Sequence, residues 1–444
     1  MKLWDKDIKT DKMIEQFTVG RDRELDLLLA PFDVLGSLAH ITMLRHIGLL
    51  TEIEFTALTD ELINIYELTE KNSFVIEEGV EDVHSQVELL LTRKLGDTGK
   101  KIHAARSRND QVLLDIKLYI RDQIQRVVGE TEGLFDLLIQ SSNLYRELLI
   151  PGYTHMQVAM PSSFGLWFGA YAESLCDDLK LLQAAYAIAD QNPLGSAAGY
   201  GSSFPINRQM TTDLLGFSGM SYNVVNAQMS RGKTEKIVSF ALSSLAGTLS
   251  KMAGDLCLFN SQNFGFISLP DELTTGSSIM PHKKNPDVFE LIRGRCNKIQ
   301  ALPAEIGNIS INLPSGYFRD MQVIKESFLP VFDEISSCLK IAAYAVPRII
   351  PARNVLEDPK YRDVFSVEEV NRKVLTGIPF REAYKAVAKQ IAEGSYNPEK
   401  TVNHTHEGSI GNLCNEQIIR KKEAVLNEFN FQRKDYAYRK LLKK

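Results

Sequence analysis

The stretch KIVSFALSSLAGTLSKMAGDLCLFN, residues 236–260, has the apolar spacing of a long buried helix. Its apolar residues recur at alternating steps of four and three, at Val238, Leu242, Leu245, Leu249, Met252, Leu256 and Phe259. Residues with this period lie along one face of an α-helix. The stretch therefore predicts a helix of several turns with one continuous apolar stripe.

Other parts of the chain extend this pattern. A second stripe runs through Phe164, Phe168, Tyr171, Leu175, Leu179, Leu182 and Tyr186, and apolar positions are denser between 110 and 150. No proline, which would break a helix, occurs between Pro31 and Pro151 or between Pro205 and Pro270. Hairpin signals are scarce. We predict an all-α fold whose long helices form a bundle, buried within one chain or shared between chains.

Length and composition suggest two or three domains of an ordinary globular protein. The 444 residues fall into a mostly helical region 1–105, a long-helix region 106–350 and a more charged, proline-broken region 351–444. An apolar fraction of 44%, a charged fraction of 24% and a net charge of −5 do not point to nucleic acid or membrane. The Lys- and Arg-rich stretch 420–444 is interpreted as a solvated helix face.

The cell compartment is predicted from the N-terminus and the cysteines. MKLWDKDIKT, residues 1–10, lacks the apolar core of a signal peptide, and no run of 18 apolar residues occurs. The five cysteines are scattered without a CxxC pair, which favours reduced thiols over disulfides or a zinc site. We expect a cytoplasmic protein.

A polar loop, GSSIMPHKKNPD at 276–287, interrupts the helical pattern. Asn285 as N-cap, Pro286 as first helical residue and Asp287 in the first turn would start a helix there. A helix N-terminus beside Lys283 and Lys284 suits a carboxylate or phosphate. A flexible connector with solvated lysines fits the loop equally simply, and the absence of GxxxxGK[ST] disfavours a nucleotide.

Three further polar segments stand at expected helix ends. HAARSRNDQ, 103–111, places two guanidinium groups before a long helix, where they suit carboxylates or serve as surface residues beside an N-cap. GYTHMQ, 152–157, places His155 between the end of one helix and the start of another. SGYFRDMQVIK, 315–325, places Tyr317, Gln322 and Lys325 on a turn and the following helix. Each alone has a plain structural interpretation.

Together and in this order, the four segments resemble the fumarase/aspartase superfamily. Its signature G-S-S-x-M-P-x-K-x-N is met by Gly276, Ser277, Ser278, Met280, Pro281, Lys283 and Asn285. RSRNDQ at 106–111, with GYTHMQ and KKNPD, is similar to the argininosuccinate lyase family within it. The matches run from the EDVH segment at 81–84 to Lys325, more than half of the chain.

The resemblance implies a reversible β-elimination in arginine biosynthesis. Argininosuccinate would give fumarate and arginine, with no metal and no cofactor. Such a reaction needs a base for the carbon proton, cations and N–H donors for the growing negative charge, and an acid for the departing guanidino nitrogen.

The resemblance also implies roles for individual residues. Ser277 would be the base, ionised when the loop closes, and His155, paired with Glu290, the general acid or its organiser. The residues implied to bind substrate are Ser107, Arg108, Asn109, Thr154, Lys283 and Asn285 for carboxylates, Tyr317, Gln322 and Lys325 for the arginine portion, and His84 and Arg231 near the site. The family's N-terminal substrate-binding serine has no counterpart in 17–26.

Finally, the resemblance implies a homotetramer whose central helices form one bundle and whose four sites each draw residues from three chains. Such sharing would account for the stripe at 238–259. Two alternatives remain: another fumarate-releasing lyase of the superfamily, and a catalytically inert structural homologue.

Overall fold

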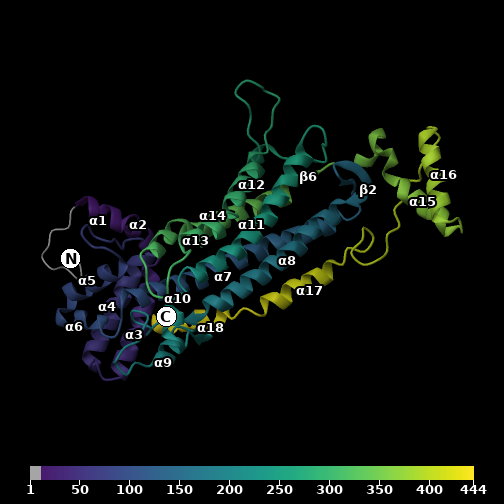
Figure 1. The fold of residues 1–444 in the computed structure, drawn as a ribbon. Coiled ribbons are helices and arrows are strands. Elements are labelled where there is room, and N and C mark those ends of the chain that lie inside the picture. The colour runs from purple at the N-terminus through teal and green to yellow at the C-terminus, as the bar shows by residue number, and fades with distance from the viewer. Residues whose placement is uncertain (1–11) are drawn as a thin grey trace.

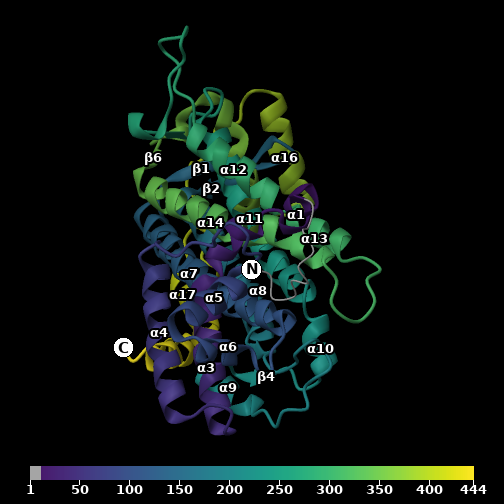
Figure 2. The same cartoon turned by 90° about the vertical axis from the view of Figure 1, so that its left-hand side faces the viewer.

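Four long helices run side by side and form the body of the molecule (Figures 1 and 2). They are α7 (Arg108–Leu144), α8 (Phe164–Ala189), α11 (Lys233–Asn260) and α14 (Asp320–Ala345). The computed structural model describes residues 12–444, so the segment used to argue against a signal peptide lies outside the described residues. The all-α prediction is confirmed, because the strands in the described part of the chain are few and short.

The apolar stripes lie in the interior of the single chain. Every residue of the α8 stripe is buried, as is the α11 stripe from Val238 to Leu256, and Phe259 packs against the same core. The α11 stripe therefore needs no second chain to cover it, and the bundle shared between subunits stays a prediction. By length and composition alone α11 is apolar enough to cross a membrane, but half of its most apolar segment is buried inside the folded protein, as in the core helix of a soluble protein.

The two ends of the bundle differ. At the amino-terminal end lie α1 (Lys12–Val19), α2 (Asp22–Leu25), α3 (Ala30–His46), α4 (Glu52–Glu70), α5 (Val83–Leu95) and α6 (Asp97–Lys100), with the 3-10 turns Asp26–Leu28 and Lys101–His103. The short α9 (Arg208–Leu214) and α10 (Val224–Met229) and the parallel pair β3 (Gln191–Asn192) and β4 (Gly219–Met220) complete it.

At the opposite end, called here the hairpin end, β1 (Leu149–Thr154) pairs with β2 (Gln157–Ser163) between α7 and α8. There β5 (Ile267–Ser268) pairs with β6 (Ile350–Pro351), and α11 connects through a long loop to α12 (Asp287–Ile299). The chain then returns through α13 (Leu302–Ile309) to the amino-terminal end, where α14 begins.

The region after 351 consists of two unlike parts. α15 (Ser366–Leu375) and α16 (Phe380–Ala392) enclose a small separate core of Val370, Ala383, Val387 and Tyr396. By contrast, α17 (Asn415–Leu426) packs on α8, and α18 (Phe431–Leu441) packs on α3 and α9. The boundaries at 105/106 and 350/351 remain a prediction.

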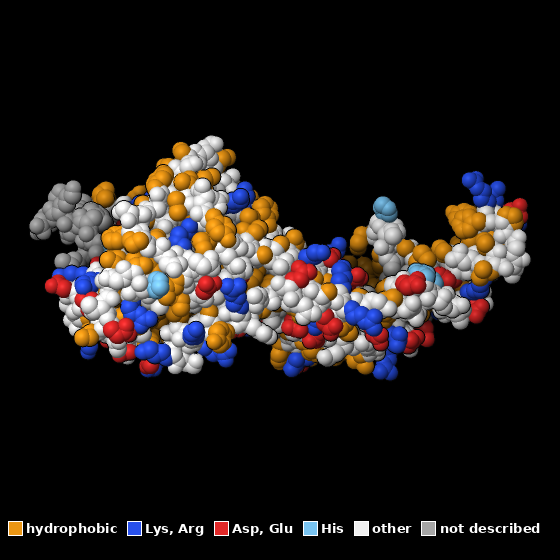
Figure 3. All heavy atoms as spheres, turned by 90° about the horizontal axis from the view of Figure 1, so that it is seen from below, with side chains coloured by type: hydrophobic (Ala, Val, Ile, Leu, Met, Phe, Trp, Pro, Cys, Tyr) orange, Lys and Arg blue, Asp and Glu red, His pale blue; other side chains and the backbone are white. Residues whose placement is uncertain are grey.

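The basic stretch 420–444 is less solvated than its composition indicates. Lys422 and Lys434 are buried, and they form ion pairs with acidic residues of α7: Glu132 and Asp136 at 3.3 and 3.0 Å, and Asp122 at 3.0 Å. The interpretation as a simple solvated face was wrong for these two lysines, because α17 and α18 lie against the acidic outer side of the bundle. Acidic and basic side chains are intermixed on the face seen in Figure 3.

A buried arginine ties α7 to the amino-terminal end. The guanidinium of Arg121 is fully buried, contacts Asp190 at 2.9 Å and donates to the carbonyl oxygens of Leu215 and Gly216. It also lies 4.2 Å from the ring centre of Phe217. This group is paired on every side, so removing it leaves a buried carboxylate without a cation.

We predict that Arg121→Leu destabilises the protein by about 3–5 kcal/mol, because breaking a buried pair strands the remaining charge. Thermal unfolding followed by circular dichroism measures the loss. Lys298→Ala is the control, since the Lys298–Glu334 pair joins α12 and α14 at 2.9 Å with an exposed lysine and contributes at most about 1 kcal/mol. Equal melting temperatures for the two variants would contradict the prediction.

Candidate functional site

A pocket of about 290 Å³ at the amino-terminal end of the bundle gathers half of the predicted site residues. Those that line it are His84, Arg108, Asn109, Arg231, Tyr317, Gln322 and Lys325. They come from α5, the start of α7, the turn before α11 and the segment that begins α14. A larger cleft of about 810 Å³ lies between α3, α4, α9 and α18, and it is lined by none of the predicted residues.

The start of α7 is fixed by a capping box. Ser107 is the N-cap, its Oγ accepts from the backbone N–H of Asn109, and Asp110 accepts from the backbone N–H of Ser107 at 2.9 Å. The buried Asp110 also accepts from the N–H groups of Gly195 and Ala197. The cap holds Asn109 at the pocket wall, so the structural and functional interpretations of RSRNDQ are compatible.

Lys325 is buried between two carboxylates that the sequence reasoning missed. Its Nζ lies 2.6 Å from Asp22 and 2.7 Å from Asp26. Burial opposes the charge on Lys325, but the two carboxylates outweigh it and raise the lysine pKa. Burial also raises the pKa of Asp22 to about 6, against the influence of Lys325. Lys325 is therefore a buried, paired cation and not a solvated surface lysine.

Gln322 connects the pocket to the chain's beginning. Its amide donates to the carbonyl oxygens of Thr18 and Val19 at 3.0 and 3.3 Å. Thr18 and Val19 belong to the stretch 17–26, in which the family's substrate-binding serine has no counterpart. Because these carbonyl groups bind Gln322, the backbone of this stretch lies beside the pocket.

Arg108 and Arg231 present guanidinium groups from two sides. Arg108 contacts Glu81 at 2.9 Å and Asp82 at 3.1 Å. Arg231 is buried, pairs with Glu235 at 2.9 Å and donates to the carbonyl oxygen of Met321. Its Nη1 is shielded from solvent and has no hydrogen-bond partner within residues 12–444. A pocket anion would satisfy it.

The pocket residues that sequence reasoning missed are mostly acidic: Asp22, Asp26, Glu81 and Asp82, with Arg319 beside them. The sequence held a signal for the four acidic residues. Asp22 and Asp26 are four residues apart and thus project from one face of a helical turn. Glu81 and Asp82 stand within the EDVH segment, directly before His84.

At the hairpin end, His155 and Met156 form the two-residue turn between β1 and β2. Both have positive φ, 52° and 58°, as a type I′ hairpin turn requires. The prediction that His155 lies between the end of one helix and the start of the next is confirmed, since α7 ends at Leu144 and α8 begins at Phe164. The connection is a hairpin, in which Pro151 and Pro161 face each other and disfavour helix on both sides. Thr154 and His155 are exposed at this tip.

The loop 276–284 projects from the same end and is closed at its base (Figure 2). Thr275 and Asn285 form a backbone bridge, with N–H to oxygen distances of 3.1 and 2.8 Å. Asn285 is therefore not the N-cap: α12 begins at Asp287 with Pro286 at the cap position. The predicted helix start was one residue early because the backbone of Asn285 is committed to closing the loop.

Ser277 lies half-buried within this loop, and its Oγ accepts from two backbone N–H groups. The donors are Ile279 at 3.4 Å and Met280 at 3.2 Å. N–H groups directed at a hydroxyl oxygen favour its ionised form. Lys283 and Glu290 are exposed nearby, on the loop and on the first turn of α12.

Within one chain, the predicted site residues thus fall into two groups at opposite ends of the helical bundle. Asn109 lies at the start of α7, whereas Thr154 and His155 follow its end after a short connection. A helix of 37 residues is about 55 Å long at ~1.5 Å per residue. Within one chain, therefore, the RSRNDQ segment cannot meet His155.

Known proteins of one family match this chain in sequence, in some cases over nearly its whole length. A family model described as "Lyase" matches residues 5–301. Argininosuccinate lyase of Parabacteroides distasonis is 64% identical over 441 residues, 99% of each chain. Argininosuccinate lyase of Thermotoga neapolitana is 39% identical over 392 residues, covering 88% of this chain and 98% of its own.

Solved structures share the fold. An EDDS lyase variant with bound fumarate has a TM-score of 0.77 at 20% identity, covering 98% of this chain and 95% of its own. A class II fumarase from Schistosoma mansoni has a TM-score of 0.71 at 15% identity, covering 96% and 94%.

We predict that Lys325→Met destabilises the amino-terminal end, because Asp22 and Asp26 would then be buried without their cation, at a cost of about 3–5 kcal/mol. Adding Asp26→Asn should recover part of that loss, since one of the stranded charges is removed. Thermal melting of the single and double variants tests the coupling. Strictly additive losses would show that Lys325 and Asp26 do not act as a pair.

Proposed function

The chain belongs to the argininosuccinate lyase family, and we propose that it carries out that family's reaction as a carbon–nitrogen lyase of arginine biosynthesis. Argininosuccinate undergoes reversible β-elimination to fumarate and L-arginine. The observation that carries this proposal is the 64% identity to an argininosuccinate lyase from end to end of both chains.

The charge distribution of the pocket supports this substrate. Argininosuccinate carries carboxylates and a guanidinium group, so it needs partners of both signs. Arg108, Arg231 and Lys325 are cationic, and Asp22 and Glu81 are anionic, around one pocket of about 290 Å³. Such mixed lining suits a compact substrate with both charges better than a simple anion.

Ser277 is the base in this proposal. A free serine hydroxyl is far too weak a base, so its ionised form has to be stabilised. The backbone N–H groups of Ile279 and Met280 already face its Oγ. Closure of the loop would bring the Lys283 ammonium toward the same charge and exclude water.

The other predicted residues, from both ends of the bundle, bind the substrate and deliver a proton. Lys283 and Asn285, with Ser107, Asn109 and Thr154, hold the succinyl carboxylates as negative charge grows there. His155, organised by Glu290, protonates the departing guanidino nitrogen. Tyr317, Gln322 and Lys325 bind the arginine portion.

The active site is assembled from several copies, and we propose a homotetramer. The supporting observation is the separation along α7, about 55 Å between the RSRNDQ segment and the hairpin. Side chains so far apart act on one substrate only if other copies bring the hairpin and the loop to the pocket. In the proposed tetramer each site draws on three chains, so the hairpin and the loop come from two different copies. We also propose a cytoplasmic location, which the five free cysteines support.

The assay for this function measures the ultraviolet absorbance of fumarate. Purified protein should release fumarate from argininosuccinate in preference to adenylosuccinate, malate or aspartate. Preference for another compound of this panel would replace the proposed substrate, and turnover of none would favour an inert structural homologue.

We predict that Ser277→Ala lowers turnover by about 10²–10⁴-fold, the range in which a positioned proton-transfer group contributes, without changing assembly. The adjacent Ser278→Ala is the matched control, because it removes a hydroxyl from the same loop. Turnover by Ser277→Ala at the control's level would remove Ser277 from the role of base.

We predict that two inactive variants restore each other's activity when mixed. After unfolding and joint refolding of Ser277→Ala with His155→Asn, about a quarter of the sites should receive both intact residues, if two different copies supply them at random. Mixing Ser277→Ala with the double variant Ser277→Ala/His155→Asn is the control and should restore nothing. No recovery in the first mixture would contradict the supply of Ser277 and His155 by two different copies.

A further inference from the structure

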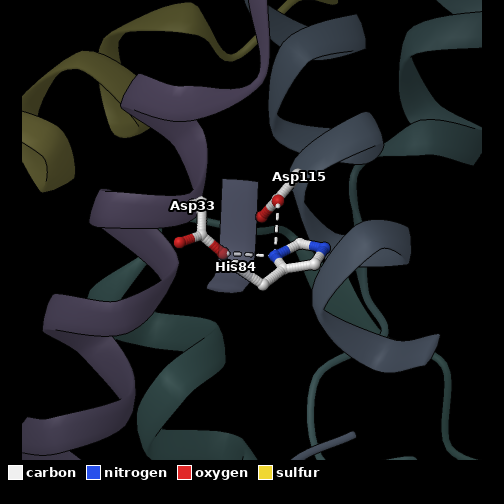
Figure 4. A group of neighbouring side chains, drawn as sticks. All are labelled: Asp33, His84 and Asp115. Carbon is white, nitrogen blue, oxygen red and sulfur yellow. Dashed lines mark hydrogen bonds and ion pairs between the residues drawn. The ribbon is translucent and has the colours of Figure 1, made fainter. Parts of the chain in front are cut away.

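His84 is held by two buried carboxylates from helices on either side of it (Figure 4). Its Nδ1 lies 2.7 Å from Oδ1 of Asp33 on α3 and 3.6 Å from Oδ2 of Asp115 on α7. All three side chains are at least 94% shielded from solvent. The two carboxylates converge on one nitrogen of one ring.

The other ring nitrogen is free to act on the pocket. In Figure 4, Nε2 points away from Asp33 and Asp115. His84 lines the pocket together with Arg108 and Asn109, and within residues 12–444 its side-chain hydrogen bond is made by Nδ1, not by Nε2. A proton on Nδ1 is fixed by Asp33, so the charge on the ring decides whether Nε2 donates or accepts.

A close approach of α3 and α7 makes this arrangement possible. Gly36 lies one turn after Asp33, and a Cβ there would come within 2.6 Å of Leu114 Cδ2, the neighbour of Asp115. The glycine thus lets the two helices come close enough for both carboxylates to reach the imidazole.

The surrounding charges favour an added proton. Burial alone would lower the pKa of His84, but Asp33, Asp115 and Asp82 outweigh it and raise the pKa to about 9. Burial raises the pKa of the Asp115 carboxyl, and the positive charges of His84 and Arg106 oppose that rise. The charged groups that act on the ring or on Asp115 are Asp26 in the turn before α3, Asp33 on α3, Asp82 at the start of α5, His103 and Arg106 before α7, and Arg108 and Asp115 on α7.

The same three ligands could hold a metal ion, yet a proton fits this cluster better. Arg106, which donates to Ser37 at 3.0 Å, already acts on both Asp33 and Asp115. With the imidazolium, two cations balance two carboxylates, whereas a divalent ion beside Arg106 would leave an excess of positive charge in a buried place.

We propose that Asp33 and Asp115 are positioning residues that keep His84 as an imidazolium, whose Nε2–H donates to a carboxylate of the substrate in the pocket. The identity of that carboxylate rests on the proposed function. The charge state of His84 does not, because it follows from the chain's own residues.

Nitrogen NMR of protein labelled with ¹⁵N-histidine tests the charge state without substrate. At about pH 8, the signal assigned to His84 by its loss in His84→Gln should show both ring nitrogens protonated. Asp33→Asn should convert it to the neutral form, because the amide accepts from Nδ1–H but carries no charge. Asp178→Asn, which removes a buried carboxylate of α8 bonded to Ser244 and Thr248, is the control and should leave the signal unchanged.

Kinetics test the positioning role. Asp33→Asn should raise KM for argininosuccinate about tenfold or more near pH 8, with a smaller rise near pH 6, where the lower pH and the remaining carboxylates Asp115 and Asp82 favour protonation of the imidazole. Asp115→Asn should behave alike and serves if Asp33→Asn does not fold. A purely structural defect would raise KM equally at both pH values and overturn the proposal.

Two further results would overturn it: a neutral His84 in the unaltered protein near pH 8, or a stoichiometric metal ion lost on Asp33→Asn. If the unaltered protein does not turn over argininosuccinate, the proposed function fails, while the NMR result still decides the charge state.

The pH dependence of stability has a definite sign. A histidine whose pKa is raised on folding contributes stability that is complete below about pH 6.5, its unfolded pKa, and is lost as pH rises through about 9. We therefore predict that the melting temperature of the protein falls over this window more than that of His84→Gln. Parallel curves would show that His84 binds no extra proton in the folded state.

Discussion

Packing of the buried apolar side chains of α7, α8, α11 and α14 is the constraint on which the other features depend. These side chains are distributed along most of each helix, so the four helices must lie lengthwise beside one another. The length of these helices then sets the distance between the amino-terminal end and the hairpin end of the bundle. Because α7 is 37 residues long, the RSRNDQ segment and the β1–β2 hairpin are kept about 55 Å apart.

The amino-terminal end places charged groups in the interior, and each is balanced by a neighbour. Lys325 lies between Asp22 and Asp26, Arg231 pairs with Glu235, and His84 lies between Asp33 and Asp115. Burying charges in this way adds little net stability, since desolvation offsets the attraction. Their cost is better explained by a pocket that must present fixed cations and donors to a charged substrate.

The sequence predicted those parts that depend on local patterns. The stripes of α8 and α11 and the N-cap at Ser107 follow from helical spacing and capping chemistry. The turn at His155 and Met156 could not be recognised, because type I′ turns are signalled by Gly or Asn and neither is present. The pairing of Asp33 with His84 and Asp115 joins positions far apart in sequence, which only the packing of α3, α5 and α7 brings together.

The two ends also differ in how firmly their residues are held. At the amino-terminal end, Lys325 and Arg231 are fixed by ion pairs before any substrate arrives. At the hairpin end, the hydrogen bonds of Ser277 among the described residues come from its own loop, and His155 is exposed on a turn of two positive-φ residues. A rigid end suits recognition, because fixed donors lose little entropy on binding. An exposed loop and turn suit groups that become ordered only when the rigid pocket of another copy lies against them, which would couple catalysis to assembly.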